Sequence, residues 1–282
     1  MALTVNTNVT SLNVQKNLNK ASDALSTSMT RLSSGLKINS AKDDAAGLQI
    51  ATRMTSQIRG QTMAIKNGND GISIAQTAEG AMQEQTNILQ RMRELAVQSR
   101  NDSNSSDDRD ALNKEFTAMA SELSRIAGST NLNGKNLLDG SASTMTFQVG
   151  SNTGADNQIT LDLTAKFDAA SLGITSGITV AGSSSAEAET NFSAAVGAID
   201  DALKTINASR ADLGAAQNRL TSTIANLQNI NENASAALGR VQDTDFASET
   251  AQLTKQQTLQ QASTAVLAQA NQLPSAVLKL LQ

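Results

Sequence analysis

The feature that most constrains the fold is a run of apolar residues at coiled-coil spacing late in the chain. From Phe192 to Val241 these residues recur at alternating steps of four and three positions. Such a repeat draws an apolar stripe along a helix, and a stripe this long needs a second helix to bury it. The predicted inter-helix seam consists of Ile199, Leu203, Ile206, Leu213, Leu220, Ile224 and Leu227. Polar Arg210, Gln217 and Asn231 interrupt the stripe, which weakens the seam but fixes its register.

Aromatic residues are almost missing, which limits the kind of core that the chain can build. The 282 residues include five Phe and neither Trp nor Tyr. Because aromatic rings supply much of the buried area in ordinary globular cores, we expect an aliphatic, Ala-rich core between long helices. The chain also has no Cys and no His. This excludes disulfides, thiolate metal sites, cysteine nucleophiles and histidine bases.

The N-terminal half carries similar stripes. One follows Ile74, Ala78, Ala81, Ile88, Met92 and Leu95, and a shorter one follows Leu112, Phe116, Met119, Leu123 and Ile126. The stretch 101–106 between them contains only Asn, Asp and Ser, which is typical of a turn. We therefore expect two helices here, joined as an antiparallel hairpin.

The middle of the chain has a different pattern. Residues 145–149 and 158–163 alternate apolar and polar side chains, and a stretch containing Gly and Asn separates them. This pattern predicts a β-hairpin with a loop of several residues. A further short strand is expected at 178–180.

Together these patterns predict a mainly α protein. We expect a long antiparallel helical, coiled-coil rod with both termini at one end and a small β-hairpin inserted at mid-chain. The two ends of the chain resemble each other, since residues 1–22 and the stretch after Glu249 contain Lys but no acid, with spaced aliphatic residues. Ends of like charge do not attract, so burial of apolar surface must drive any pairing between them.

Charge and hydropathy exclude several classes of function. A net charge of −4 provides no basic field that would attract nucleic acid. No apolar stretch is long enough to span a membrane. Residues 1–22 lack the apolar segment and cleavage site of a signal peptide, so we expect a cytoplasmic protein or one that is exported by another route.

No catalytic motif is found. The sequence contains neither of the glycine-rich phosphate-binding motifs. The acidic pairs 43–44, 107–108 and 200–201 are the remaining candidates for cation binding or acid–base chemistry, and we interpret them as charges at helix N-termini or on solvent-facing surfaces. We therefore expect no catalytic, metal-binding or cofactor-binding residues and no cofactor.

Several long strings of residues resemble bacterial flagellins. On the N-terminal side these are 31–36 (RLSSGL), 38–47 (INSAKDDAAG), 69–76 (NDGISIAQ) and 90–98 (QRMRELAVQ), and on the C-terminal side 213–220 (LGAAQNRL), 260–262 (QQA), 266–272 (VLAQANQ) and 277–281 (VLKLL). The resemblance covers roughly 140 residues at the start and 90 at the end. The middle is short for the family.

The resemblance implies a structural subunit, not an enzyme, that self-assembles into the flagellar filament used for swimming. It also implies export in unfolded form through the flagellar type III system and a final location outside the cell. Residues 1–44 and 241–282 would form the inner, filament-core domain. Residues 45–140 and 186–240 would form the helices of a rod domain, and residues 141–185 a small β-rich segment.

The resemblance also implies partners. These are copies of the chain itself, the export chaperone, the filament cap and the hook–filament junction proteins, with neither nucleic acid nor membrane insertion. The tail that the chaperone binds and the filament core buries would comprise Leu273, Val277, Leu278, Leu280 and Leu281. A hook–filament junction protein of the same family is the alternative, and the strings at 90–98 and near the C-terminus favour a flagellin.

A host Toll-like receptor is a further partner that the resemblance implies. Its contact residues would be Arg91, Leu95 and Glu115. From spacing alone, Leu95 belongs to an apolar stripe, and Arg91 is placed to pair with Glu94 three positions away.

Overall fold

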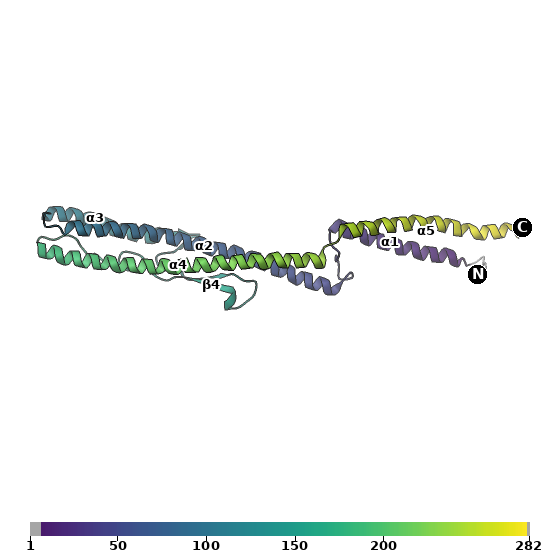
Figure 1. The fold of residues 1–282 in the computed structure, drawn as a ribbon, viewed down its shortest axis with the longest axis horizontal. Coiled ribbons are helices and arrows are strands. Elements are labelled where there is room, and N and C mark those ends of the chain that lie inside the picture. Colours follow the sequence, from purple (N-terminus) through teal and green to yellow (C-terminus); the bar gives the residue numbers. More distant parts are fainter. Residues whose placement is uncertain (1–6, 281–282) are drawn as a thin grey trace. The chain divides into compact units, whose positions relative to one another are not determined.

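The protein is mainly α, as the sequence predicted. The computed structural model describes the backbone of residues 7–280 and the side chains up to residue 272. Its helices are α1 (Val9–Ser34), α2 (Ala45–Ser99), α3 (Ser106–Ser129), α4 (Ser185–Gln242) and α5 (Phe246–Leu280) (Figure 1). The turn expected at 101–106 separates α2 from α3, so the predicted helical hairpin is confirmed.

Two small antiparallel hairpins lie between α3 and α4. The predicted hairpin is confirmed as β3 (Ser143–Gln148) and β4 (Gln158–Leu163), which pair throughout and are joined through a single 3₁₀ turn (Ala155–Asn157). A second hairpin, β1 (Asn131–Leu132) with β2 (Lys135–Asn136), was not predicted. Its strands are two residues long, too short to show any alternation in the sequence.

The strand expected at 178–180 is wrong, because this segment forms no strand. Residues 179 and 180 donate their hydrogen bonds to the side chain of Asn113 on α3, and not to a neighbouring strand. The Asn113 Oδ1 atom accepts from the Val180 N–H at 3.0 Å and from the Thr179 hydroxyl at 2.8 Å. Val180 is fully buried, so the segment packs as an irregular strap held by one side chain.

The chain divides into two compact units, each built from sequence-distant segments. The terminal unit comprises Met1–Ile58 and Glu232–Gln282, and the central unit comprises Arg59–Asn231. The boundaries between the two units fall inside α2 and α4.

In the central unit, α3 and α4 both pack along α2 (Figure 1). α4 runs antiparallel to α2, since Arg93 pairs with Asp200 at 2.6 Å while Gln217, farther along α4, bonds to the earlier Glu79. The core is aliphatic apart from Phe116, Phe147 and Phe167. Its members include Ala75, Ala78, Met82, Leu89, Met92, Leu95, Leu123, Leu137, Leu138, Leu161 and Leu163.

The helix ends follow from local chemistry. Ser105 and Asp108 form a reciprocal capping box at the start of α3, in which the hydroxyl accepts from one N–H and the carboxylate from the other. The Asn8 side chain caps the start of α1. At its end, Gly35 takes the left-handed conformation (φ +74°) and its N–H bonds to the Arg31 carbonyl.

In the terminal unit, α1 and α5 lie antiparallel (Figure 1). The Asn8 side-chain amide donates to the Ala270 carbonyl at 2.8 Å. At the other end of the pair, Arg31 lies 3.6 Å from Glu249. The links that precede α2 and α5 are also joined, because the Thr244 N–H donates to the Gly35 carbonyl at 2.9 Å.

Candidate functional site

The apolar residues of the inter-helix seam all lie on α4 and face the core of the protein. Six of them are buried, Ile199, Ile206, Leu213, Leu220, Ile224 and Leu227, and Leu203 is partly buried against the same core. Glycines of α2 allow the close approach. A Cβ atom on Gly71 would lie 3.2 Å from both Leu220 and Phe147, so a side chain at this position would crowd both of them.

The polar positions of the seam are bonded across to α2. The Gln217 amide donates to Glu79 at 2.9 Å, and Arg210 lies 3.8 Å from the other oxygen of the same carboxylate. Farther along, the Asn231 amide donates to the Thr62 hydroxyl at 3.3 Å. These cross-helix bonds can form in only one alignment of α2 and α4, and buried polar pairs are known to specify register in this way.

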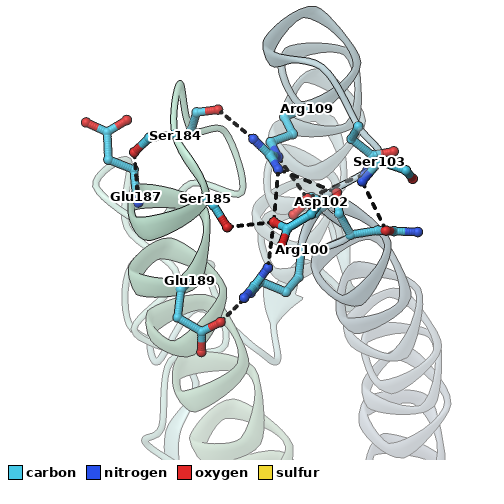
Figure 2. A network of polar contacts seen from close by, with 12 residues as sticks. Arg100, Asp102, Ser103, Arg109, Ser184, Ser185, Glu187 and Glu189 are labelled. Carbon is cyan, nitrogen blue, oxygen red and sulfur yellow. Dashed lines mark hydrogen bonds and ion pairs between the residues drawn. The ribbon is translucent and has the colours of Figure 1, made fainter.

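A polar clasp joins α2, α3 and α4 where α2 ends, as Figure 2 shows. Its centre is Arg109 on α3, which is 5% exposed. The guanidinium donates to three backbone carbonyls, those of Ser99 at 3.1 Å, Asn101 at 3.4 Å and Gly182 at 3.4 Å. Arg109 thereby satisfies carbonyls at the C-terminus of α2 and ties them to the segment before α4.

The outer part of the clasp is exposed and charged. Ser185 is the first residue of α4, and its hydroxyl donates to Asp102 at 2.6 Å. Arg100 donates to Asp102 at 3.0 Å and also to Glu189. The hydrogen bond from Ser185, assisted by the positive charge of Arg100, lowers the pKa of Asp102 below its ordinary value. The sequence did not identify this clasp.

The three residues expected to contact the host receptor differ in how far they are exposed to solvent. Arg91 donates to Glu115 at 3.0 Å across the α2–α3 pair and to Glu94 at 2.9 Å within α2. The side chains of Arg91 and Glu115 are about half exposed, at 48% and 40%. Leu95 is fully buried in the core, as its place in the apolar stripe implied, so only the charged pair faces solvent.

The paired terminal helices leave apolar side chains exposed. Val9, Leu12 and Met29 of α1 are 56%, 57% and 58% exposed, and Leu259 and Val266 of α5 are 44% and 49% exposed. In α1 only Ala21 and Ser28 are buried. The side chains of the tail residues Leu273, Val277, Leu278 and Leu280, and the whole of Leu281, lie outside the described part of the protein.

Two kinds of site were sought among the described residues, a metal site and a membrane-spanning helix. Within them, no group of three His, Cys, Asp or Glu side chains is arranged to hold a metal. No helix in this part of the chain combines the length and hydropathy that a membrane span requires.

Comparison with known proteins agrees with the helical architecture. Residues 5–143 match the family model of the bacterial flagellin N-terminal helical region, and residues 196–281 match that of the C-terminal helical region. The chain is 41% identical over 375 residues to Flagellin B of Vibrio cholerae serotype O1, and 40% identical over 379 residues to Flagellin A of Vibrio anguillarum. Each alignment covers all of this chain and all of the relative.

A solved structure supports the fold independently. A chain from Vibrio parahaemolyticus described as a flagellar hook-associated protein superposes with a TM-score of 0.59, covering 71% of this chain and all of that one, at 15% identity. The two family models and the full-length relatives, together with the helical fold, define the class as a helical structural protein of the bacterial flagellum. Within that class, the chain belongs to the bacterial flagellin family and is a subunit of the flagellar filament.

Proposed function

We propose that the terminal unit is the part of the subunit that polymerises, with residues 1–44 and 241–282 forming the inner domain of the filament. The observation that carries this proposal is the exposed apolar surface of α1 and α5. Leu12, Met29 and Val266 are each about half exposed, although large apolar side chains are worth about 1.5–3 kcal/mol each when buried. A neighbouring subunit that covers them recovers this free energy.

The polar composition of α5 favours packing against copies of the same helix. After Glu249 the chain contains no acid, and the exposed positions of α5 are mostly Gln, Thr, Ser and Ala. The hydroxyls of Thr250, Thr254 and Thr258 bond back to carbonyls of α5 four residues earlier, so their methyl groups remain for packing. Such a surface, on which Lys255 is the one charge among the described side chains after Glu249, approaches its copies with little repulsion between like charges.

Membership of the flagellin family supports the remaining parts of this proposal. Residues 45–140 and 186–240 form the rod domain and residues 141–185 its β-rich segment. The chain leaves the cell unfolded through the flagellar type III system, functions outside the cell, and meets the export chaperone, the filament cap and the junction proteins on its way. The C-terminal tail from Leu273 to Leu281 binds the chaperone first and enters the filament core afterwards. The protein as a whole has no catalytic activity.

A host Toll-like receptor binds the face formed by α2 and α3. Arg91 and Glu115 supply the exposed contacts, because their side chains reach solvent and are already paired. Leu95 contributes by holding the backbone of α2 against the core, since its side chain is buried.

Removal of most of α5 tests the polymerisation proposal. A chain lacking residues 248–282 keeps the central unit and should remain helical by circular dichroism, but it should not elongate filament seeds in electron micrographs. Normal filaments from this truncated chain would refute the proposal. A full-length chain that never elongates any seed would instead favour the junction-protein alternative.

Point variants of adjacent residues give a sharper test. Leu259→Ser removes a large exposed apolar side chain, whereas Thr258→Ser next to it removes a single methyl group. If burial of Leu259 contributes about 1.5 kcal/mol or more, the monomer concentration at which seeded growth stops should rise roughly tenfold or more. Thr258→Ser, which gives up a single methyl group, should raise this concentration clearly less. Equal effects of the two variants would contradict burial of this face.

A further inference from the structure

The sequence contains two Asn–Gly pairs, and the structure puts them in opposite environments. Asn67–Gly68 lies inside α2, whereas Asn133–Gly134 forms the tip of the β1–β2 hairpin. This difference matters because Asn followed by Gly is the least hindered sequence for spontaneous cyclisation, and asparagine is among the thermolabile residues of proteins.

The reaction needs only the chain and water. The backbone nitrogen of the glycine attacks the side-chain carbonyl carbon of the asparagine and forms a five-membered succinimide. The bond between that carbon and the amide nitrogen breaks, and ammonia leaves with the proton from the glycine N–H. Water then opens the ring at one of its two carbonyls, giving aspartate or isoaspartate. Glycine favours the first step because it has no Cβ to shield its nitrogen.

At the hairpin tip both reacting groups are free. Asn133 and Gly134 are exposed, and in the described part of the protein neither the Asn133 amide nor the Gly134 N–H has a hydrogen-bond partner. Both residues have positive φ, +51° and +76°, as in a type I′ turn. Ring closure requires this turn to open, and strands of only two residues resist opening weakly.

Inside α2 both reacting groups are occupied. The Gly68 N–H belongs to the hydrogen-bond ladder of a 55-residue helix. The Asn67 side-chain amide donates to the Gln148 carbonyl at 3.0 Å. Gly68 is also buried, packed so closely that a Cβ would meet Ile224 at 3.0 Å. Cyclisation here requires α2 to unfold locally.

We propose that Asn133–Gly134 is a site of spontaneous deamidation and isoaspartate formation in the folded protein, and that Asn67–Gly68 is protected. Isoaspartate lengthens the backbone by one carbon within a two-residue turn. The register of Leu132 with Lys135 cannot survive that change. Leu137 and Leu138, both fully buried in the core of the central unit, follow β2 directly, so we expect the modification to loosen their packing.

Peptide mapping by mass spectrometry tests the proposal on the full-length protein. After incubation at mildly alkaline pH, the peptide with Asn133 should gain the mass of deamidation and split into aspartate and isoaspartate forms, roughly a hundredfold faster than the peptide with Asn67. In denaturant the two peptides should react at similar rates, because both are then free. Asn133→Gln should abolish the modification, since its ring would have six members. Equal native rates at the two sites, or no reaction at Asn133, would overturn the proposal.

Discussion

Arg109 at the start of α3 donates through its Nε atom to the carbonyl of Ser99, 3.1 Å away in the last turn of α2. The arginine is almost fully buried, yet it lies among the acidic residues that open α3. Arg109 therefore acts as a cap for the C-terminus of α2, although it lies ten residues later in the chain than Ser99.

Replacement of Arg109 should destabilise the central unit. Arg109→Ala removes three hydrogen bonds to backbone carbonyls and leaves the partly buried Gly182 carbonyl without a donor. We expect a loss of about 2 kcal/mol in the free energy of unfolding. Arg125→Ala is the matched control, because Arg125 pairs only with exposed Glu122 within α3 and should cost less than about 1 kcal/mol. Urea denaturation followed by circular dichroism measures both. A loss at Arg109 no larger than that at Arg125 would contradict the role of the clasp.

Two glycines of α2 should respond oppositely to the same substitution. Gly80→Ala meets no atom within 4 Å and should stabilise the helix by about 0.5–1 kcal/mol. Gly71→Ala places its methyl group 3.2 Å from buried Leu220 and Phe147 at once, so neither neighbour can give way freely. We expect the crowding, about 1–3 kcal/mol, to exceed the gain in helix propensity. Thermal unfolding of the two variants should therefore shift in opposite directions, and parallel shifts would show that α2 and α4 are less closely packed than described.

Acid should weaken the start of α3. Hydrogen bonds from the Ser105 hydroxyl and then from its backbone N–H hold the pKa of Asp108 below its ordinary value of 3.8. Because the pKa is lower in the folded state, the stabilisation is fully present above the unfolded pKa and disappears as the pH falls through the folded one. Asp108→Asn should therefore lower stability at neutral pH and flatten its decline below about pH 4. Denaturation curves at several pH values measure this, and parallel declines for the variant and the wild type would disprove the link.

Receptor recognition should depend on Arg91. Arg91→Ala removes the exposed guanidinium that pairs with Glu115 and Glu94 and leaves the buried core untouched, so we expect weaker activation of the flagellin-sensing receptor in a reporter-cell assay. Arg125→Ala again serves as the control, because it also removes one exposed Arg that forms an ion pair with Glu. Unchanged signalling by Arg91→Ala, with normal circular dichroism, would count against this face as the contact.

Periodicity in the sequence was enough to predict the helices. The four-and-three spacing through Ile199 and Leu220 predicted their burial, because an apolar stripe of that length is buried only when a second helix packs against it. The alternation around Met145 and Leu161 likewise predicted the main hairpin. The same periodicity placed Leu95 in the core, against the surface role that family resemblance implied for it.

Two buried polar residues in or beside the stripes, Arg109 and Gln85, were the part that sequence patterns could not interpret. Arg109 continues the stripe of Leu112 and Phe116 by one step, and Gln85 fills a gap in the stripe of α2. Both are buried, and Gln85 donates to the Phe167 carbonyl at 2.8 Å. Their position in the heptad was a usable signal of burial. Their partners are backbone carbonyls of distant segments, however, and no periodicity identifies those.

The composition of each unit from distant segments has a consequence for the timing of folding. The bond between Asn8 and Ala270 joins positions 262 residues apart, and the central unit cannot close until α4 has been synthesised. Contacts of such separation form late and slowly, because a long loop must close before any of its free energy is recovered. The two ends can therefore pair only after almost the whole chain has been synthesised.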